Sequence, residues 1–174
     1  LDAGERTLRL ILVPRHAERS GDIAEKCRQV GKTYELRSEV QNGRNSQVPE
    51  VLVVDTTGEL SAFYGISDIN IIGKSFYGVG GQNFLEAARF PHPIVVGPEM
   101  SNFKDTVEQF KSEEALIQVR DSDELQSKLQ ELLMNQEQRT AFGAQAVRVM
   151  SQNRGAGIRQ ARMIADYLQS REIV

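Results

Sequence analysis

The sequence predicts an α/β fold in which a doubly wound parallel sheet is covered by helices on both faces. Short apolar runs rich in Val and Ile alternate with segments whose apolar residues recur every three or four positions, as strands alternate with amphipathic helices. Polar and glycine residues gather directly after four of these runs, where the carboxyl ends of parallel strands would lie. A chain of 174 residues suits one such domain, so we expect a single domain over 1–174.

The individual elements follow from local patterns along the chain. The run 7–13 predicts a buried strand that stops at Pro14, because proline has no N–H to donate to a sheet. Apolar residues three and four apart predict a helix over 17–30 that ends at Gly31. Segment 41–47 is polar and rich in turn residues, which predicts a mobile loop. By the same reasoning we expect further strands at 34–37, 51–54, 69–72, 94–96 and 116–119, and further helices from Leu60 and at 83–89, 102–111, 124–134, 136–151 and 157–171.

The composition argues against several classes of protein. A net charge of -3 argues against a nucleic-acid-binding surface, because domains that bind duplexes are usually basic. Cys27 is the only cysteine, so no disulfide can form within the chain. The longest apolar run, 10–13, is far shorter than the roughly 20 residues that cross a bilayer. The chain begins without Met and without the pattern of a signal peptide, so we expect it to be cut from something longer.

The stretch 69–98 carries the clearest functional pattern. A predicted strand is followed by glycines at 78, 80 and 81 and then by a predicted helix start at Asn83. Glycine has no Cβ and helix amides carry partial positive charge, so this arrangement suits a phosphate. Glu86 would repel a phosphate but can accept hydrogen bonds from sugar hydroxyls. A phosphate site next to a sugar site indicates a nucleotide. The alternative is a capping box, in which Asn83 and Glu86 bond to helix amides and bind no ligand.

Other motifs in the chain do not fit their patterns. Gly73-Lys74-Ser75 resembles the end of a P-loop, but the first glycine of that motif would fall on Asp68. The glycines at 78 and 80 resemble a dinucleotide fingerprint whose third glycine is missing. Asp121-Ser122-Asp123 resembles a metal motif, but an acid followed three residues later by Glu124 is better explained as a helix start. We therefore expect no metal site and no cofactor.

Polar groups also follow two earlier strands. Arg15 follows the first strand, where a cation could face an anionic ligand or pair with a surface acid. Thr57-Gly58-Glu59 follows the strand at 51–54, where the glycine permits close backbone approach and Glu59 could meet a polar ligand or extend a helix start. Parallel strands end at one edge of their sheet, so we expect the loops after them to meet there.

Four motifs occur in order along nearly the whole chain: Pro14-Arg15-His16-x-Glu18-Arg19, Asp55-Thr56-x-Gly58-Glu59-Leu60, Gly80-Gly81-Gln82-Asn83-x-Leu85-Glu86-x-Ala88, and Gly97-Pro98 with Asn102-Phe103. Together they resemble the second half of the 3-deoxy-D-manno-octulosonic acid (Kdo) transferases, which add Kdo to the lipid A precursor. The resemblance implies a Rossmann-like donor-binding domain, the C-terminal half of a GT-B glycosyltransferase, with the N-terminal acceptor domain absent from this chain.

The resemblance also implies a ligand and partners. The donor would be CMP-Kdo and the acceptor a lipid A precursor, bound through the missing half at the cytoplasmic face of the bacterial inner membrane. The implied CMP contacts are Pro14, Arg15, Thr57, Gly58, Glu59, Asn83, Phe84, Leu85 and Glu86, with His16, Gly80, Gly81 and Gln82 as additional candidates.

The implied reaction is an inverting, metal-independent transfer whose catalytic base lies in the missing half. We therefore expect this chain alone to bind CMP weakly and to transfer nothing. It departs from the family pattern at Gln82, where histidine is usual, and glutamine cannot carry a positive charge. Prolines usual in the family are also replaced, by Ala17, Phe84 and Ala87.

Two other functions fit the same pattern. One is another GT-B enzyme, a transferase or an epimerase, that uses a UDP-sugar. The other is a non-enzymatic, flavodoxin-like interaction domain whose glycine loop is purely structural.

Overall fold

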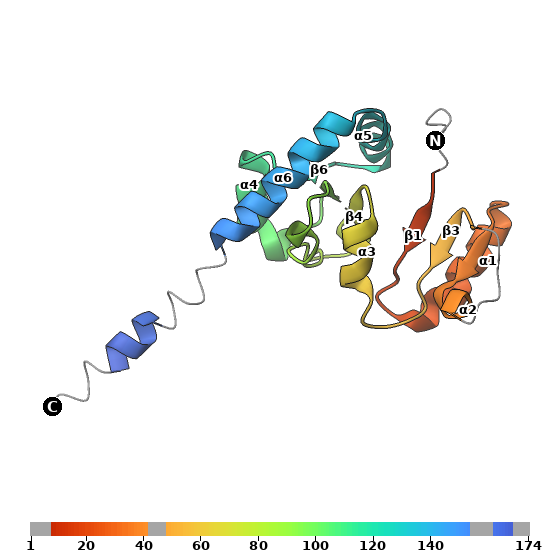
Figure 1. Ribbon diagram of the computed structural model, residues 1–174, viewed down its shortest axis with the longest axis horizontal. Helices are drawn as coiled ribbons and strands as arrows, with labels where there is room; N and C mark the ends of the chain where they lie inside the picture. The colour runs from red at the N-terminus through yellow and green to blue at the C-terminus, as the bar shows by residue number, and fades with distance from the viewer. Residues whose placement is uncertain (1–7, 42–47, 154–161, 169–174) are drawn as a thin grey trace. The chain divides into compact units, whose positions relative to one another are not determined.

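The chain folds into two compact units, each with its own parallel sheet. The computed structural model in Figure 1 describes residues 8–41, 48–153 and 162–168. The first unit is Leu1–Ile66 and the second is Ser67–Val174. Within the described residues, no helix combines the length and the apolar character needed to cross a bilayer.

The first unit is built on three parallel strands. They are β1 (Leu10–Leu12), β2 (Tyr34–Leu36) and β3 (Val51–Val53), in the order β1-β3-β2. One face of the sheet packs against α1 (Ser20–Gln29), whose Cys27 is buried with two valines of the central strand. The remaining helices are η1 (Ala17–Arg19), α2 (Arg37–Gln41) and α3 (Leu60–Ile66).

The second unit is also built on three parallel strands, but in a different order. They are β4 (Asn70–Ile72), β5 (Ile94–Val96) and β6 (Ile117–Gln118), in the order β4-β5-β6. All three residues of β5 are 0% exposed, because a central parallel strand is covered on both faces. The helices are η2 (Gly73–Phe76), η3 (Ala87–Arg89), η4 (Ser101–Phe103), α4 (Lys104–Ser112), α5 (Ser122–Met134) and α6 (Gln136–Asn153), and residues 162–168 are also helical.

Two local features fix the positions of α5 and α6 in the second unit. Asp121 caps the start of α5, and its Oδ1 accepts hydrogen bonds from the N–H groups of Asp123 at 3.1 Å and Glu124 at 2.9 Å. The predicted helix start is therefore confirmed. Helix α6 lies so close to the turn before β5 that a Cβ at Gly143 would come within 2.1 Å of the Pro91 carbonyl oxygen.

The α/β class with parallel strands is confirmed, although the sheets differ from the prediction in detail. Backbone pairing joins the described strands in two three-stranded sheets, where the sequence predicts one. The strand expected at 34–37 ends at Leu36, and Arg37 begins α2. The expected loop at 41–47 lies almost entirely outside the described residues, and the expected helix 157–171 is described only at 162–168.

The prediction of a helix over 83–89 is wrong, because the structure has only the short 3-10 turn η3 at its end. The Asn83 side chain accepts a hydrogen bond from the Leu85 N–H at 2.9 Å, which closes a turn two residues long. The Asn83 side chain therefore does not form the predicted capping box with Glu86, and no side-chain cap is present at the start of η3.

Candidate functional site

The loops that follow β1 and β3 leave the same edge of the first unit's sheet. The two strands are adjacent and in register, with Leu12 opposite Val53. The Val54 N–H donates to the Leu12 carbonyl oxygen at 2.9 Å, which extends the pairing to the point where both loops begin. The two loops therefore begin side by side at one edge of this sheet, as the sequence predicts for parallel neighbours.

The residues after β1 are available to a ligand. Pro14 is half-buried, and Arg15 and His16 are exposed. No described residue pairs with the Arg15 guanidinium. The nearest acid to His16 is Glu18, with Nδ1 and Oε1 3.7 Å apart and side chains that are 60% and 78% exposed. Arg15 can thus meet an anion without first breaking an ion pair among the described residues.

The loop after β3 presents exposed Thr57 and Gly58 and a firmly held Glu59. Gly58 has φ +85, a left-handed conformation that favours glycine. The Glu59 carbonyl oxygen accepts from Ala62 N–H at 2.9 Å and so begins α3. Thr57 and Gly58 are therefore exposed residues of the turn that precedes α3.

Both carboxylate oxygens of Glu59 have partners. Arg37 donates to Oε1 from Nε at 3.2 Å and from Nη2 at 2.9 Å, and the Thr56 hydroxyl donates to Oε2. The Arg37 and Glu59 side chains are only 26% and 27% exposed. The hydrogen bond from Thr56, and then that from Arg37, lowers the pKa of Glu59 below its ordinary value.

A second contact joins the start of α2 to the loop after β3. Ser38 donates to Asp55, from its N–H to Oδ1 at 2.9 Å and from its hydroxyl to Oδ2 at 2.6 Å. Burial raises the pKa of Asp55, but these hydrogen bonds outweigh it and leave the pKa below the ordinary value. The start of α2 and the loop after β3 are therefore joined through two carboxylates, and no pattern in the sequence indicates Arg37 or Ser38.

In the second unit, the loops after β4 and β5 also meet. Ser75 is fully buried, and its hydroxyl oxygen accepts from the Gly97 N–H at 2.6 Å. The Ser75 carbonyl oxygen accepts from the Glu99 N–H at 2.9 Å. A Cβ on Gly97 would lie 2.6 Å from that same carbonyl oxygen, so the close approach requires glycine.

The glycine loop itself rests on the segment after β5. The Asn102 N–H donates to the Gly80 carbonyl oxygen at 3.3 Å. Gly80 and Gly81 have φ +92 and +72, and a Cβ on Gly81 would lie 2.5 Å from the Glu99 carbonyl oxygen. The third and fourth motifs of the sequence thus form one packed structure.

Among the residues after the glycine loop, Phe84 is buried in the core and its neighbours are more exposed. Phe84 is 0% exposed and packs edge-on against Phe110 at 5.1 Å and Phe103 at 6.4 Å between ring centroids. Its side chain is a core residue, so only its backbone can face a ligand. Asn83 and Glu86 are exposed, Gln82 and Leu85 are half-buried, and no described residue pairs with the Glu86 carboxylate.

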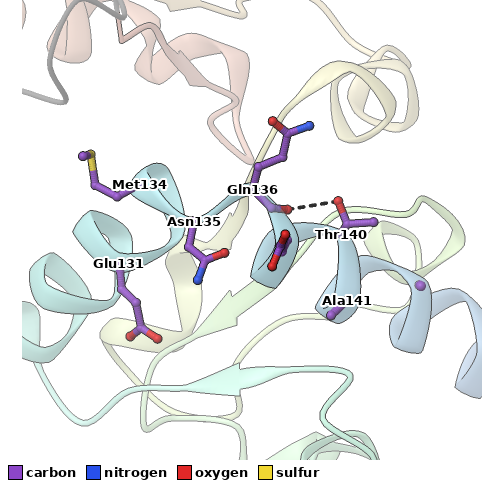
Figure 2. A pocket seen from close by; sticks show the side chains of 8 residues that line it. Glu131, Met134, Asn135, Gln136, Thr140 and Ala141 are labelled. Carbon is purple, nitrogen blue, oxygen red and sulfur yellow. Dashed lines mark hydrogen bonds between the residues drawn. The ribbon is translucent and has the colours of Figure 1, made fainter.

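The structure therefore groups the predicted residues by unit. Pro14, Arg15, His16 and 57–59 follow neighbouring strands of the first unit, and 80–86 belong to the second. Figure 2 shows a surface hollow elsewhere in the second unit, at the junction of α5 and α6. Its lining, which includes Met134 and Thr140, contains none of the predicted residues.

Several curated proteins resemble this chain in sequence. A 3-deoxy-D-manno-octulosonic acid transferase of Haemophilus influenzae is 32% identical over 163 residues, which cover 93% of this chain and 38% of that protein. Those of Rickettsia bellii and Aquifex aeolicus are 36% and 33% identical, over 71% and 73% of this chain and 29% and 34% of their own length. The chain spans about a third of these relatives, and the expected resemblance to Kdo transferases is confirmed.

A solved structure supports the fold. The C-terminal CMP-Kdo binding domain of WaaA from Acinetobacter baumannii matches with a TM-score of 0.73 and 24% identity, over 83% of this chain and 90% of that one. The sequence also matches the family described as glycosyl transferases group 1 over residues 26–149, which is well over half of its length. This chain belongs to the glycosyl transferases group 1 family.

Proposed function

We propose that the chain is the single donor-binding domain of a Kdo transferase, which moves Kdo from CMP-Kdo to the lipid A precursor in lipopolysaccharide biosynthesis. The main support is the 32% identity to a 3-deoxy-D-manno-octulosonic acid transferase over 93% of this chain. The second support is the exposed, unpaired state of Arg15 and Glu86 among the described residues, since a phosphate and a ribose need such groups.

In this proposal the first unit supplies the cation and one acceptor for CMP. Arg15 faces the phosphate, and Pro14 restricts the backbone before it. Thr57 and Gly58 are exposed, and the absence of a Cβ at Gly58 permits close approach of the ligand to the backbone. Glu59 accepts a hydrogen bond from the nucleoside, and His16 is an additional candidate.

The second unit supplies the glycine loop and a second acceptor. Glu86 accepts hydrogen bonds from the ribose hydroxyls, while Asn83, Leu85 and the backbone of Phe84 shape the surface beside it. Gly80, Gly81 and Gln82 are additional candidates, whose N–H groups can face an anion.

The proposed reaction is an inverting, metal-independent displacement. An acceptor hydroxyl attacks the anomeric carbon of Kdo, the bond from that carbon to the phosphate oxygen breaks, and CMP leaves with the bonding electrons. Positive charge is what stabilises the charge that gathers on the departing phosphate, and Arg15 is the cation proposed for this role. The catalytic base and the acceptor site belong to the rest of the full-length enzyme, at the cytoplasmic face of the inner membrane.

Calorimetry with CMP, UMP and UDP tests the proposal. We expect weak binding of CMP by the 174-residue chain and weaker binding of UMP and UDP. A clear preference for UDP would instead support a UDP-sugar enzyme of the same fold. An Asn83→Ala, Glu86→Ala variant should lose CMP binding, and unchanged binding would favour a purely structural glycine loop. Detectable Kdo transfer by this chain alone would refute the assignment of the catalytic base to the missing part.

A further inference from the structure

We infer that Arg37 is a positioning residue for the donor nucleotide, which acts through Glu59 and does not itself contact the ligand. The inference rests on the proposed function, because it requires that Glu59 accept a hydrogen bond from CMP. It adds a residue that none of the four motifs contains.

The geometry fixes the Glu59 carboxylate before any ligand binds. Arg37 makes two hydrogen bonds to one carboxylate oxygen, and the Thr56 hydroxyl makes one to the other. A glutamate held at both oxygens loses little further conformational freedom on binding, which favours affinity. Each oxygen can accept more than one hydrogen bond, and the side chain is 27% exposed, so capacity for a ligand donor remains.

The charge of Arg37 serves the same purpose. CMP is an anion, and an uncompensated carboxylate at 59 would repel it. The guanidinium offsets this charge at 2.9 Å, without removing the carboxylate as an acceptor. Arg37 also begins α2 directly after β2, and the next residue bonds to Asp55, so its own position is fixed by the fold.

A contribution to stability alone is the competing explanation. Ion pairs near a protein surface usually contribute little to the stability of a fold. The two explanations differ in one observable: a positioning residue changes CMP affinity only while Glu59 is present.

A double-mutant cycle measured by calorimetry with CMP separates them. The proteins are the unsubstituted 174-residue chain, Arg37→Gln, Glu59→Gln and the double variant. We expect Arg37→Gln to weaken CMP binding by about 10-fold, and by less than about 2-fold when Glu59→Gln is already present. Arg37→Lys keeps the charge but not the two-bond geometry, so it should weaken binding less than Arg37→Gln does.

The control is Arg28→Gln, which removes a similar pair with Glu25 on the exposed surface of α1. It should leave CMP affinity unchanged, and thermal unfolding should show that each variant is folded. Should Arg37→Gln fail to fold, the Arg37→Lys variant, measured with and without Glu59→Gln, carries the test. A loss that is equal in both Glu59 backgrounds, or no loss at all, would overturn the inference while the proposed function stands. If the unsubstituted chain binds no CMP, the proposed function fails first and the inference with it.

Discussion

The two candidate loops are held in place by different forces. In the first unit, the loop after β3 is fixed by charged side chains, through Arg37 with Glu59 and Ser38 with Asp55. In the second unit, the loop after β4 is fixed by steric fit, because Gly81 lies where no Cβ can be placed. The first arrangement responds to charge and pH, whereas the second responds to volume.

The steric loop depends most on its aromatic anchor. Phe84→Ala removes a side chain that is 0% exposed and packed against two other rings, so it should lower the free energy of unfolding by about 3–5 kcal/mol. Chemical denaturation of the variant measures this loss. Tyr77→Ala is the matched control, since Tyr77 belongs to the same loop but is 58% exposed. Comparable losses for the two variants would contradict the assignment of Phe84 as the anchor.

Two glycine substitutions sharpen the comparison between the loops. Gly81→Ala places a Cβ 2.5 Å from the Glu99 carbonyl oxygen at φ +72, and should cost about 2–5 kcal/mol through overlap and backbone strain together. Gly58→Ala has a similar φ, +85, but meets nothing within 4 Å, so only the strain of about 1–2 kcal/mol should remain. The difference between their unfolding free energies measures the steric part alone. Equal losses of unfolding free energy would mean that the loop after β4 accommodates an added Cβ as easily as the loop after β3 does.

Much of this organisation could be predicted from the sequence. Apolar runs located the strands, because burial of a parallel strand leaves a continuous apolar segment. Asp121 and Glu124 located a helix start, since capping is a local interaction with a local pattern. The pairing of loops also followed, because parallel neighbours place their carboxyl ends together.

Other features depend on contacts that no local pattern reports. Arg37 pairs with Glu59, 22 positions away, and nothing in the spacing of either residue indicates the partner. The helix expected at 83–89 is absent because Asn83 bonds to a nearer amide than a helix cap would. The resemblance places Phe84 among the CMP contacts, whereas its ring is buried by Phe110 and Phe103 from later in the chain, so only its backbone can face a ligand. The burial of a single aromatic residue in a loop cannot be predicted from the sequence, because loop residues follow no helical or strand periodicity.

The charged loop should respond to acid, with the smallest of the three effects. Hydrogen bonds from Thr56 and Arg37 hold the pKa of Glu59 below its ordinary value of 4.5. A carboxyl whose pKa is lowered by folding contributes stability that is complete above its unfolded pKa and is lost as the pH falls through the folded value. The first unit should therefore lose stability below about pH 4.5, and Glu59→Gln should make that loss less steep.

Thermal unfolding followed between pH 7 and about pH 3 measures the difference between the two proteins. Glu18→Gln is the control, because that carboxylate is 78% exposed and lies no closer than 3.7 Å to His16. The slope of stability against pH should change for Glu59→Gln and not for Glu18→Gln. Parallel curves for Glu59→Gln and the unsubstituted chain would mean that the Arg37 and Thr56 contacts do not favour the ionised carboxylate in solution. The loop after β3 would then not be held by charge, and its contrast with the sterically held loop after β4 would be wrong.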